Sequence, residues 1–198
     1  MIKPGIEIGY KIMKPFITFK FKHKYHPVVY GEENIPKTGA FIICGNHRHK
    51  DDQYNVMIVT KRVIHYMAKE EYFEGKQEWF YRLAGCIKVD RRVHDENAKS
   101  EALSLLKEGK CVGIFPEGTR NKTFGTKDEV ELLPFKFGAV SLAKKANVPI
   151  IPFGTRGEYN GKKGQLITNI GKPIDISNMD LESANELLRN KILELMKK

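Results

Sequence analysis

The sequence is poor in cysteine, which argues against two kinds of site. Its 198 residues include three cysteines, Cys44, Cys86 and Cys111, and each lies in an apolar stretch. A disulfide scaffold or a zinc site needs cysteines clustered at ligand spacing, and no CxxC pair occurs here. We therefore expect no metal, and we expect buried free thiols in a reducing compartment.

Long apolar runs are missing as well. No window approaches the roughly 18 consecutive apolar residues of a membrane-spanning helix. The N-terminal segment never runs long without a charged residue, which argues against a signal peptide. We expect a chain without a transmembrane span, held peripherally or monotopically on the cytoplasmic side of a membrane or left in the cytoplasm.

Acidic residues are outnumbered by basic ones. The chain has 24 Asp and Glu against 34 Lys and Arg, which gives a formal net charge of +10. This balance predicts an anionic partner, which could be nucleic acid, an anionic membrane surface or a phosphorylated substrate. The charge alone leaves all three open.

The imbalance is strongest in residues 1–26, where Glu7 is the only acid among apolar residues and lysines. A helix from about Ile6, with a bend or break at Pro15, would set an apolar side against a basic side, as a helix in a lipid interface does. An ordinary amphipathic helix packed on the core would give the same pattern. The scarcity of acids favours the membrane surface, so residues 1–26 are a candidate anchor segment.

The rest of the chain, residues 27–198, is predicted to form one domain. No linker or internal repeat divides it, and the 41% apolar content is typical of a globular protein. Short β-branched and apolar runs alternate with helical patterns, which predicts an α/β fold with a mostly parallel sheet flanked by helices. The sheet is mixed if its first strands pair antiparallel. The expected strands lie in "VVYGEENIP", "GAFIICGN", "VIHYMA", "GCIKVD", "KCVGIFP", "VPIIPFG" and "GQLITNIGKPI", and the expected helices lie near 51–61, 77–84, 95–108, 135–146 and 179–198.

Polar clusters follow three of these strands directly. They are "NHRHKDD" after "FIIC", "VDRR" after "CIK" and "PEGTR" after "VGIF". Ligands of open α/β sheets bind beyond the carboxyl ends of the strands. The sequence therefore places the candidate site at these three clusters.

The first cluster contains a titratable pair, His47 and Asp52. On a regular helix the two would lie about 140° apart, but a strand-to-helix turn could bring them together. A carboxylate that holds one imidazole nitrogen fixes the tautomer and leaves the other nitrogen to take a proton from a hydroxyl. Alternatively, Asp51 or Asp52 caps a helix and His47 is a loop residue. Taken alone, the pair favours this structural alternative.

The third cluster offers groups that suit a phosphate monoester. Glu117, Gly118, Thr119 and Arg120 follow the strand, and the Arg120 guanidinium could bind a phosphate through two hydrogen bonds. An exposed turn with a solvated arginine would show the same residues.

Taken in order, these blocks resemble the 1-acylglycerol-3-phosphate acyltransferase family, over residues 28 to about 175. "NHRHKDD" resembles the family's His-x4-Asp motif, "GCIKVDRR" its glycine, strand, aspartate and arginine block, "FPEGTR" its glycerol-phosphate block and "VPIIP" its last block. "MAKEEYF" is more weakly similar to the family's Ala-Lys segment. The resemblance implies His47 as catalytic base with Asp52 as its partner, and substrate binding by Lys69, Arg91, Glu117, Gly118, Thr119 and Arg120.

The resemblance also implies a reaction. It is transfer of a fatty acyl group from acyl carrier protein or acyl-CoA to the sn-2 hydroxyl of 1-acylglycerol-3-phosphate, which makes the chain a 1-acylglycerol-3-phosphate O-acyltransferase of phospholipid biosynthesis that needs no cofactor. The basic N-terminus would then meet an anionic membrane surface, and nucleic acid would not be a partner. Two alternatives stay open: acylation of another lysolipid, and a basic binding protein without enzymatic activity. His49 could compete with His47 as the base, and Lys50 makes this loop unusually basic.

Overall fold

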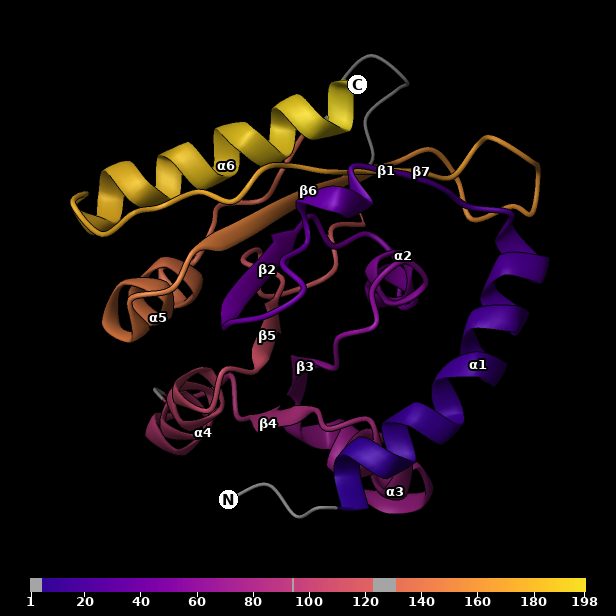
Figure 1. The fold of residues 1–198 in the computed structure, drawn as a ribbon, viewed down its shortest axis with the longest axis horizontal. Coiled ribbons are helices and arrows are strands. Elements are labelled where there is room, and N and C mark those ends of the chain that lie inside the picture. Colours follow the sequence, from indigo (N-terminus) through magenta and orange to yellow (C-terminus); the bar gives the residue numbers. More distant parts are fainter. Residues whose placement is uncertain (1–4, 94, 123–130) are drawn as a thin grey trace.

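The fold is built on a mixed sheet of seven strands, in a computed structural model that describes residues 5–93, 95–122 and 131–198. The strand order is β1-β7-β6-β2-β5-β3-β4 (Figure 1). The strands are β1 (Val28–Tyr30), β2 (Phe41–Gly45), β3 (Ile64–Lys69), β4 (Ile87–Val89), β5 (Cys111–Ile114), β6 (Ile150–Arg156) and β7 (Ile167–Ile170). Each coincides with a β-branched or apolar run, as the sequence predicts.

The sheet is mostly parallel, as expected, but its antiparallel pair is not where we expected it. The first two strands are not neighbours: β1 pairs in parallel with β7, and β2 lies between β5 and β6. The antiparallel pair is β6 with β7. These strands are consecutive in the chain and joined without a helix, so the chain returns beside itself in the opposite direction.

Two groups of helices cover the two faces of the sheet (Figure 1). On one face lie α4 (Glu96–Lys107), α5 (Gly138–Ala146) and α6 (Leu181–Lys197). The other face carries α1 (Gly5–Tyr25), α2 (Asp52–Met57) and α3 (Glu78–Leu83). Short 3-10 turns occupy Glu32–Asn34, Glu70–Phe73 and Gly75–Gln77. The result is a three-layer α/β/α domain.

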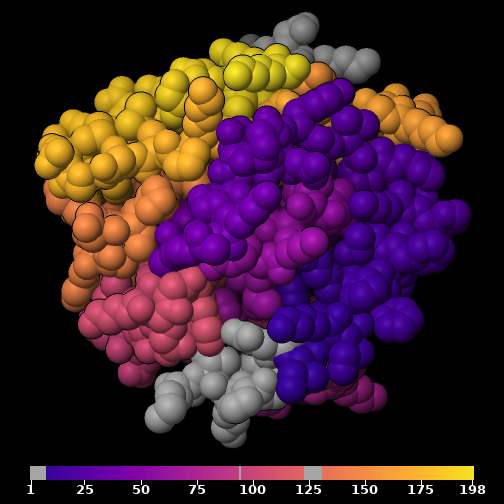
Figure 2. Space-filling model, in the orientation of Figure 1, coloured from indigo at the N-terminus to yellow at the C-terminus, as the bar shows by residue number. Residues whose placement is uncertain are grey.

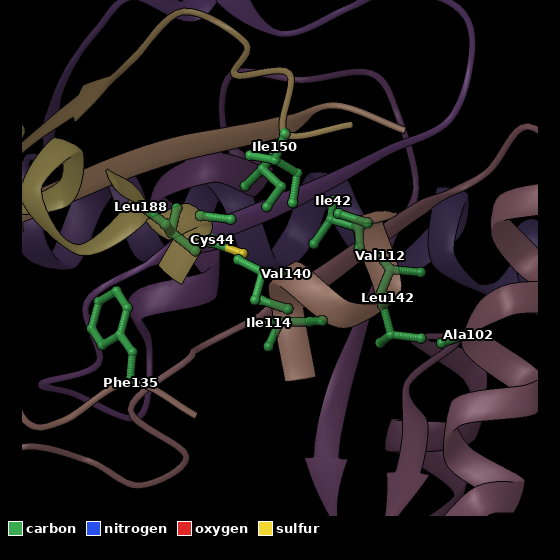
Figure 3. Close-up of a cluster of buried hydrophobic side chains, with 14 of the residues drawn as sticks. Ile42, Cys44, Ala102, Val112, Ile114, Phe135, Val140, Leu142, Ile150 and Leu188 are labelled. Carbon is green, nitrogen blue, oxygen red and sulfur yellow. The ribbon is translucent and has the colours of Figure 1, made fainter. Parts of the chain in front are cut away.

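The larger core cluster fills the space between the sheet and α4, α5 and α6 (Figure 3). Ile42 and Val112 from the central strands are fully buried there, against Val140 of α5 and Leu188 of α6. Strands buried on both faces need continuous apolar runs, which is why "FIIC" carries no alternation.

The cysteines pack in the core of the domain, with Cys44 in the larger cluster and Cys86 and Cys111 in the cluster on the other face of the sheet. All three lie in described parts of the chain, and none is in a disulfide. Cys44 and Cys111 are buried, as expected, whereas Cys86 is only partly buried. Burial raises the pKa of the Cys111 thiol to about 12, so this thiol is chemically quiet at neutral pH.

Helix α1 runs through Pro15 without a break, so of the bend or break expected there the break does not occur. The structure fits the alternative of an amphipathic helix packed on the core, and contact with a membrane stays a prediction. Tyr10, Phe21 and Tyr25 are buried against the body of the molecule, as in an ordinary amphipathic helix. Figure 2 shows the helix, in indigo, along one flank of the molecule.

The outer side of α1 is apolar and exposed. Its large side chains are 59–75% exposed and recur at helical spacing: Ile8, Ile12, Phe16 and Phe19. Within the described ranges, no helix is both long and apolar enough to cross a membrane. A stripe of this kind on a helix rich in lysine has the composition of an interfacial helix.

Candidate active site

The site lies where β2, β3, β4, β5 and β6 end, since all of these strands run in parallel to their neighbours in this part of the sheet. The chain leaves β2 through Gly45, whose backbone passes so close to Phe153 that a Cβ atom there would lie 2.3 Å from the ring. Asn46 follows and is buried. Its amide exchanges two hydrogen bonds with the backbone of Thr155, at 2.8 and 2.9 Å. These contacts fix the start of the loop that carries His47.

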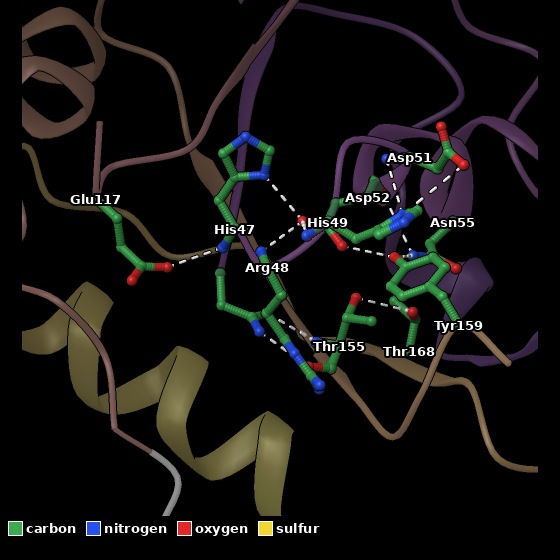
Figure 4. Close-up of polar contacts among 11 residues, drawn as sticks. His47, Arg48, His49, Asp51, Asp52, Asn55, Glu117, Thr155, Tyr159 and Thr168 are labelled. Carbon is green, nitrogen blue, oxygen red and sulfur yellow. Dashed lines mark hydrogen bonds and ion pairs between the residues drawn. The ribbon is translucent and has the colours of Figure 1, made fainter. Parts of the chain in front are cut away.

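His47 and Asp52 meet across this loop (Figure 4). The Nδ1 atom of His47 lies 2.8 Å from Oδ2 of Asp52, a carboxylate that is fully buried. The backbone N–H groups of Arg48 and His49 donate to the same oxygen, at 2.6 and 2.7 Å. The carboxylate therefore holds both the imidazole and the turn that brings it close, and Asp51 makes no side-chain cap of α2.

The imidazole ring of His47 is also held by an aromatic contact. The ring of Phe115 stacks on His47, with centroids 4.2 Å apart and planes 14° from parallel. Among the described residues, none hydrogen-bonds Nε2 of His47, and the side chain is 16% exposed. With Nδ1 bound to a carboxylate, the neutral ring presents Nε2 as an acceptor, which is the arrangement of a general base.

Glu117 holds the backbone of His47, a contact that sequence patterns did not predict. Its Oε1 accepts the backbone N–H of His47 at 2.8 Å, and its Oε2 accepts that of Leu133 at 3.0 Å. The side chain is 3% exposed, and burial raises the pKa of its carboxyl. Both oxygens thus accept from the backbone, and the role of Glu117 as a substrate ligand stays a prediction.

Two of the predicted blocks meet at Gly118. The Nη1 atom of Arg91, which follows β4, donates to the carbonyl oxygen of Gly118 at 2.6 Å. Gly118 has φ +70°, a conformation that favours glycine, and the side chain of Lys136 lies against it. Thr119 and Arg120 follow, both exposed. The structure thus brings Arg91 to the "EGTR" turn and adds Lys136. This cation was not predicted because it precedes a helix rather than following a strand.

Lys69 and Arg92 form ion pairs with nearby acidic side chains. Lys69 ends β3 and pairs with Glu71 at 2.6 Å. Arg92 binds Asp90 and Glu70, each at 2.9 Å. Of the two arginines in "VDRR", only Arg91 therefore reaches the "EGTR" turn.

His49 does not compete for the position of His47. Its ring stacks on Tyr159 at 4.1 Å, and its Nδ1 accepts the backbone N–H of Asp51 at 3.2 Å. Burial lowers the pKa of His49. Tyr159 also donates its hydroxyl to Oδ1 of Asp52 at 2.5 Å. Tyr159 was not among the predicted site residues, although it follows the carboxyl end of β6, where ligands of α/β sheets bind.

The described parts of the chain contain no group of three or more His, Cys, Asp or Glu side chains placed to hold a metal ion.

Known proteins resemble this chain in sequence and fold. A family model described as "Acyltransferase" matches residues 26–156. The 1-acyl-sn-glycerol-3-phosphate acyltransferase of Bacillus subtilis is 34% identical over 185 residues, which cover 86% of this chain and 88% of that protein. The enzyme of the same name from Saccharomyces cerevisiae is 28% identical, covering 95% of this chain and 63% of that protein.

The fold has a counterpart among solved structures. The crystal structure of the 1-acyl-sn-glycerophosphate (LPA) acyltransferase PlsC from Thermotoga maritima superposes with a TM-score of 0.75 at 24% identity. The match covers 99% of this chain and 83% of that one. At this level of identity the superposition supports the fold.

Proposed function

The chain belongs to the 1-acylglycerol-3-phosphate acyltransferase family, and from this we propose that it acylates the free sn-2 hydroxyl of 1-acylglycerol-3-phosphate (lysophosphatidate) to give phosphatidate. The observation that carries the proposal is the His47 imidazole, bound through Nδ1 to the buried Asp52 and open at Nε2. Residues 27–198 would form the acyltransferase domain. The donor is an acyl thioester, of acyl carrier protein or of coenzyme A.

The reaction balances without a cofactor. Nε2 of His47 accepts the proton of the substrate hydroxyl while the oxygen attacks the thioester carbonyl. The new C–O bond forms, the C–S bond breaks, and the thiolate that leaves accepts the proton from the imidazolium. Asp52 stabilises that imidazolium, and the acceptor hydroxyl stands where serine stands in a hydrolase triad, so no acyl-enzyme is needed.

Cations near the "EGTR" turn would hold the substrate phosphate. Arg91 already lies against Gly118, and Arg120 is exposed beside it, with no ion pair to another described residue. Lys69 could contribute if it exchanged Glu71 for the phosphate. Binding a remote phosphate positions the hydroxyl and lowers the barrier to its attack.

One assay tests this function. Purified full-length chain is incubated with lysophosphatidate, lysophosphatidylcholine or lysophosphatidylglycerol and with acyl-CoA or acyl carrier protein thioester, and release of the free thiol is followed. We expect the largest kcat/KM with lysophosphatidate. A larger value with another lysolipid would assign that acceptor instead, and salt-sensitive nucleic-acid binding without any thiol release would overturn the enzymatic function.

The phosphate site predicts a defect in binding for Arg120→Ala. We expect KM for lysophosphatidate to rise about 10- to 100-fold with little change in kcat, because a hydrogen bond to a charged group contributes roughly 1.5–3 kcal/mol. Steady-state kinetics with varied lysophosphatidate measures this. Arg62→Ala is not a suitable control, because Arg62 donates hydrogen bonds to three backbone carbonyl oxygens. The control is Arg82→Ala, since Arg82 is exposed and pairs with Glu78. An unchanged KM in Arg120→Ala would place the phosphate elsewhere.

We also propose that α1 docks on the cytoplasmic surface of an anionic membrane. Its exposed apolar stripe would enter the headgroup region, and its lysines would contribute roughly 1 kcal/mol each near anionic lipid. Both substrate and product carry acyl chains, so docking would give the site access to them. Residues 1–26 would then be a surface anchor rather than a span.

The stripe predicts a loss of vesicle binding. Phe16→Ser together with Phe19→Ser should weaken binding to phosphatidylglycerol-containing vesicles at least about tenfold, since each exposed phenyl group contributes about 1.5–3 kcal/mol when buried. Vesicle co-sedimentation measures the change. Leu181→Ser on α6, across the sheet from α1, is the control and should bind as the wild type does (Figure 1). Equal binding by all three proteins would contradict this docking surface.

A further inference from the structure

Tyr159 contacts the carboxylate of the proposed active site from the side opposite His47 (Figure 4). Its hydroxyl donates to Oδ1 of Asp52 at 2.5 Å, while Oδ2 accepts from His47 Nδ1 at 2.8 Å. We propose that Tyr159 is a positioning residue for the acyl transfer, because its hydroxyl fixes the carboxylate that orients His47. The proposal rests on the function proposed above. Tyr159 lies beyond the segment 26–156 that the family model matches.

The hydroxyl has a defined direction. Nδ2 of Asn55, a fully buried residue, donates to the Tyr159 oxygen at 2.8 Å. An oxygen that already accepts from an amide turns its own proton to the remaining acceptor, which is Asp52. Burial raises the pKa of Tyr159 well above its ordinary value, so the hydroxyl stays protonated and remains a donor throughout the working pH range.

The ring of Tyr159 is fixed by its neighbours. His49 stacks on one face at 4.1 Å, with the planes 20° from parallel, and Tyr25 of α1 meets the ring edge-on at 5.1 Å and 89°. These contacts explain the second histidine of "NHRHKDD", whose role the sequence left open. They hold the phenol so that its hydroxyl cannot leave Asp52 without disturbing α1 and the loop.

Asp52 needs this contact because its other oxygen is crowded. Oδ2 accepts from the His47 ring and from the backbone of Arg48 and His49, so all three contacts pull on one side of the carboxylate. Without a donor at Oδ1 the group could rotate about its Cβ–Cγ bond and shift Oδ2 from Nδ1. A fixed carboxylate keeps Nε2 aimed at the substrate hydroxyl, which affects kcat rather than substrate binding.

A matched pair of variants separates positioning from packing. Tyr159→Phe removes the hydroxyl and keeps the ring. Tyr25→Phe makes the same change in the same aromatic cluster. The Tyr25 hydroxyl donates to Asp51 at 3.1 Å and so lies outside the His47–Asp52 pair. Full-length wild type and both variants are compared in kcat, in KM for lysophosphatidate and for the donor, and in Tm.

We expect Tyr159→Phe to lower kcat roughly 10- to 100-fold with both KM values within about twofold, as loss of one hydrogen bond to a charged group would do. Tyr25→Phe should keep the wild-type kcat. Equal kcat values in the two variants would overturn the proposal, even with a lowered Tm in Tyr159→Phe. If the wild type acylates no lysophosphatidate, the proposed function fails, and this outcome is distinct from a normal wild type with an unaffected Tyr159→Phe.

A measurement on the wild type covers the case in which Tyr159→Phe does not fold. In protein labelled with ζ-13C tyrosine, the Tyr159 hydroxyl proton should appear downfield and exchange slowly with water, because it is buried and bound to a carboxylate. A rapidly exchanging Tyr159 hydroxyl would contradict the contact and with it the positioning role.

Discussion

His47→Ala should lower kcat for lysophosphatidate acylation by about 100- to 10,000-fold, the range that a general base contributes. The physical reason is that Nε2 of His47 is the acceptor for the substrate proton, while Nδ1 is occupied by Asp52. KM should change little, because the phosphate contacts lie on other residues. Thiol release by the purified variant, with saturating substrates, measures the loss.

The neighbouring histidine provides the control. His49→Ala should lose far less activity than His47→Ala, at most the roughly 10- to 100-fold expected if the Tyr159 contact with Asp52 is lost, since the His49 ring packs on Tyr159 and its Nδ1 accepts the backbone N–H of Asp51. Far-ultraviolet circular dichroism and Tm should show that both variants fold. Wild-type turnover by a folded His47→Ala protein would eliminate His47 as the base, and a larger loss in His49→Ala would transfer that role to His49.

Asp52→Asn should be the second most damaging change and should lower kcat by about 100- to 10,000-fold. The amide loses the negative charge that stabilises the imidazolium. The amide also has two possible orientations. Its NH2 group either takes the place of Oδ2, where it cannot accept the three hydrogen bonds that Oδ2 receives, or it faces the Tyr159 hydroxyl, which is itself a donor. Either orientation leaves a buried donor opposite another donor, which costs about 1–3 kcal/mol of stability.

Asp51→Asn is a suitable control for that variant. Asp51 is the adjacent acid, and its carboxylate contacts Tyr25 and His49 rather than His47. We expect Asp51→Asn to keep wild-type kcat. Kinetics and thermal denaturation of both variants distinguish the two carboxylates, and equal kcat for Asp52→Asn and wild type would show that His47 needs no carboxylate.

The elements predicted from local patterns correspond closely to those in the structure. The helical pattern at 95–108 gives α4, Glu96–Lys107, and the pattern at 179–198 gives α6, Leu181–Lys197. Both begin after an aspartate whose side chain caps the first turn, Asp95 and Asp180. Periodicity and capping are properties of neighbouring residues, so a single sequence carries them.

The pairing of strands was harder to predict. The sequence allowed the first strands to be neighbours, but β1 pairs with β7, which comes from the far end of the chain. Nothing within residues 28–45 encodes that partner, because strand order is decided by which strands bury their faces together. The burial of one side of α1 has the same origin, since that side packs against α2 and α3.

In the candidate site, too, local features were predicted and long-range contacts were not. The sequence identified His47 and Asp52 because a short loop joins them to one strand end, and it identified "EGTR" as a compact turn. It did not predict the contacts of Glu117, whose two oxygens accept from the backbone of His47 and Leu133. A carboxylate beside a turn that could bind a phosphate suggests a ligand, and only the fold reveals that it is buried.

The helices and strands, their alternation in an α/β domain and the strand ends that carry the site residues could be predicted from the sequence, because these features depend on residues close together in the chain. Three contacts became visible only in the folded molecule: Tyr159 reaches Asp52 from 107 positions away, Arg91 meets Gly118, and α1 buries one apolar side while exposing another. These contacts join separate segments, and their formation depends on how the sheet and both helical layers pack.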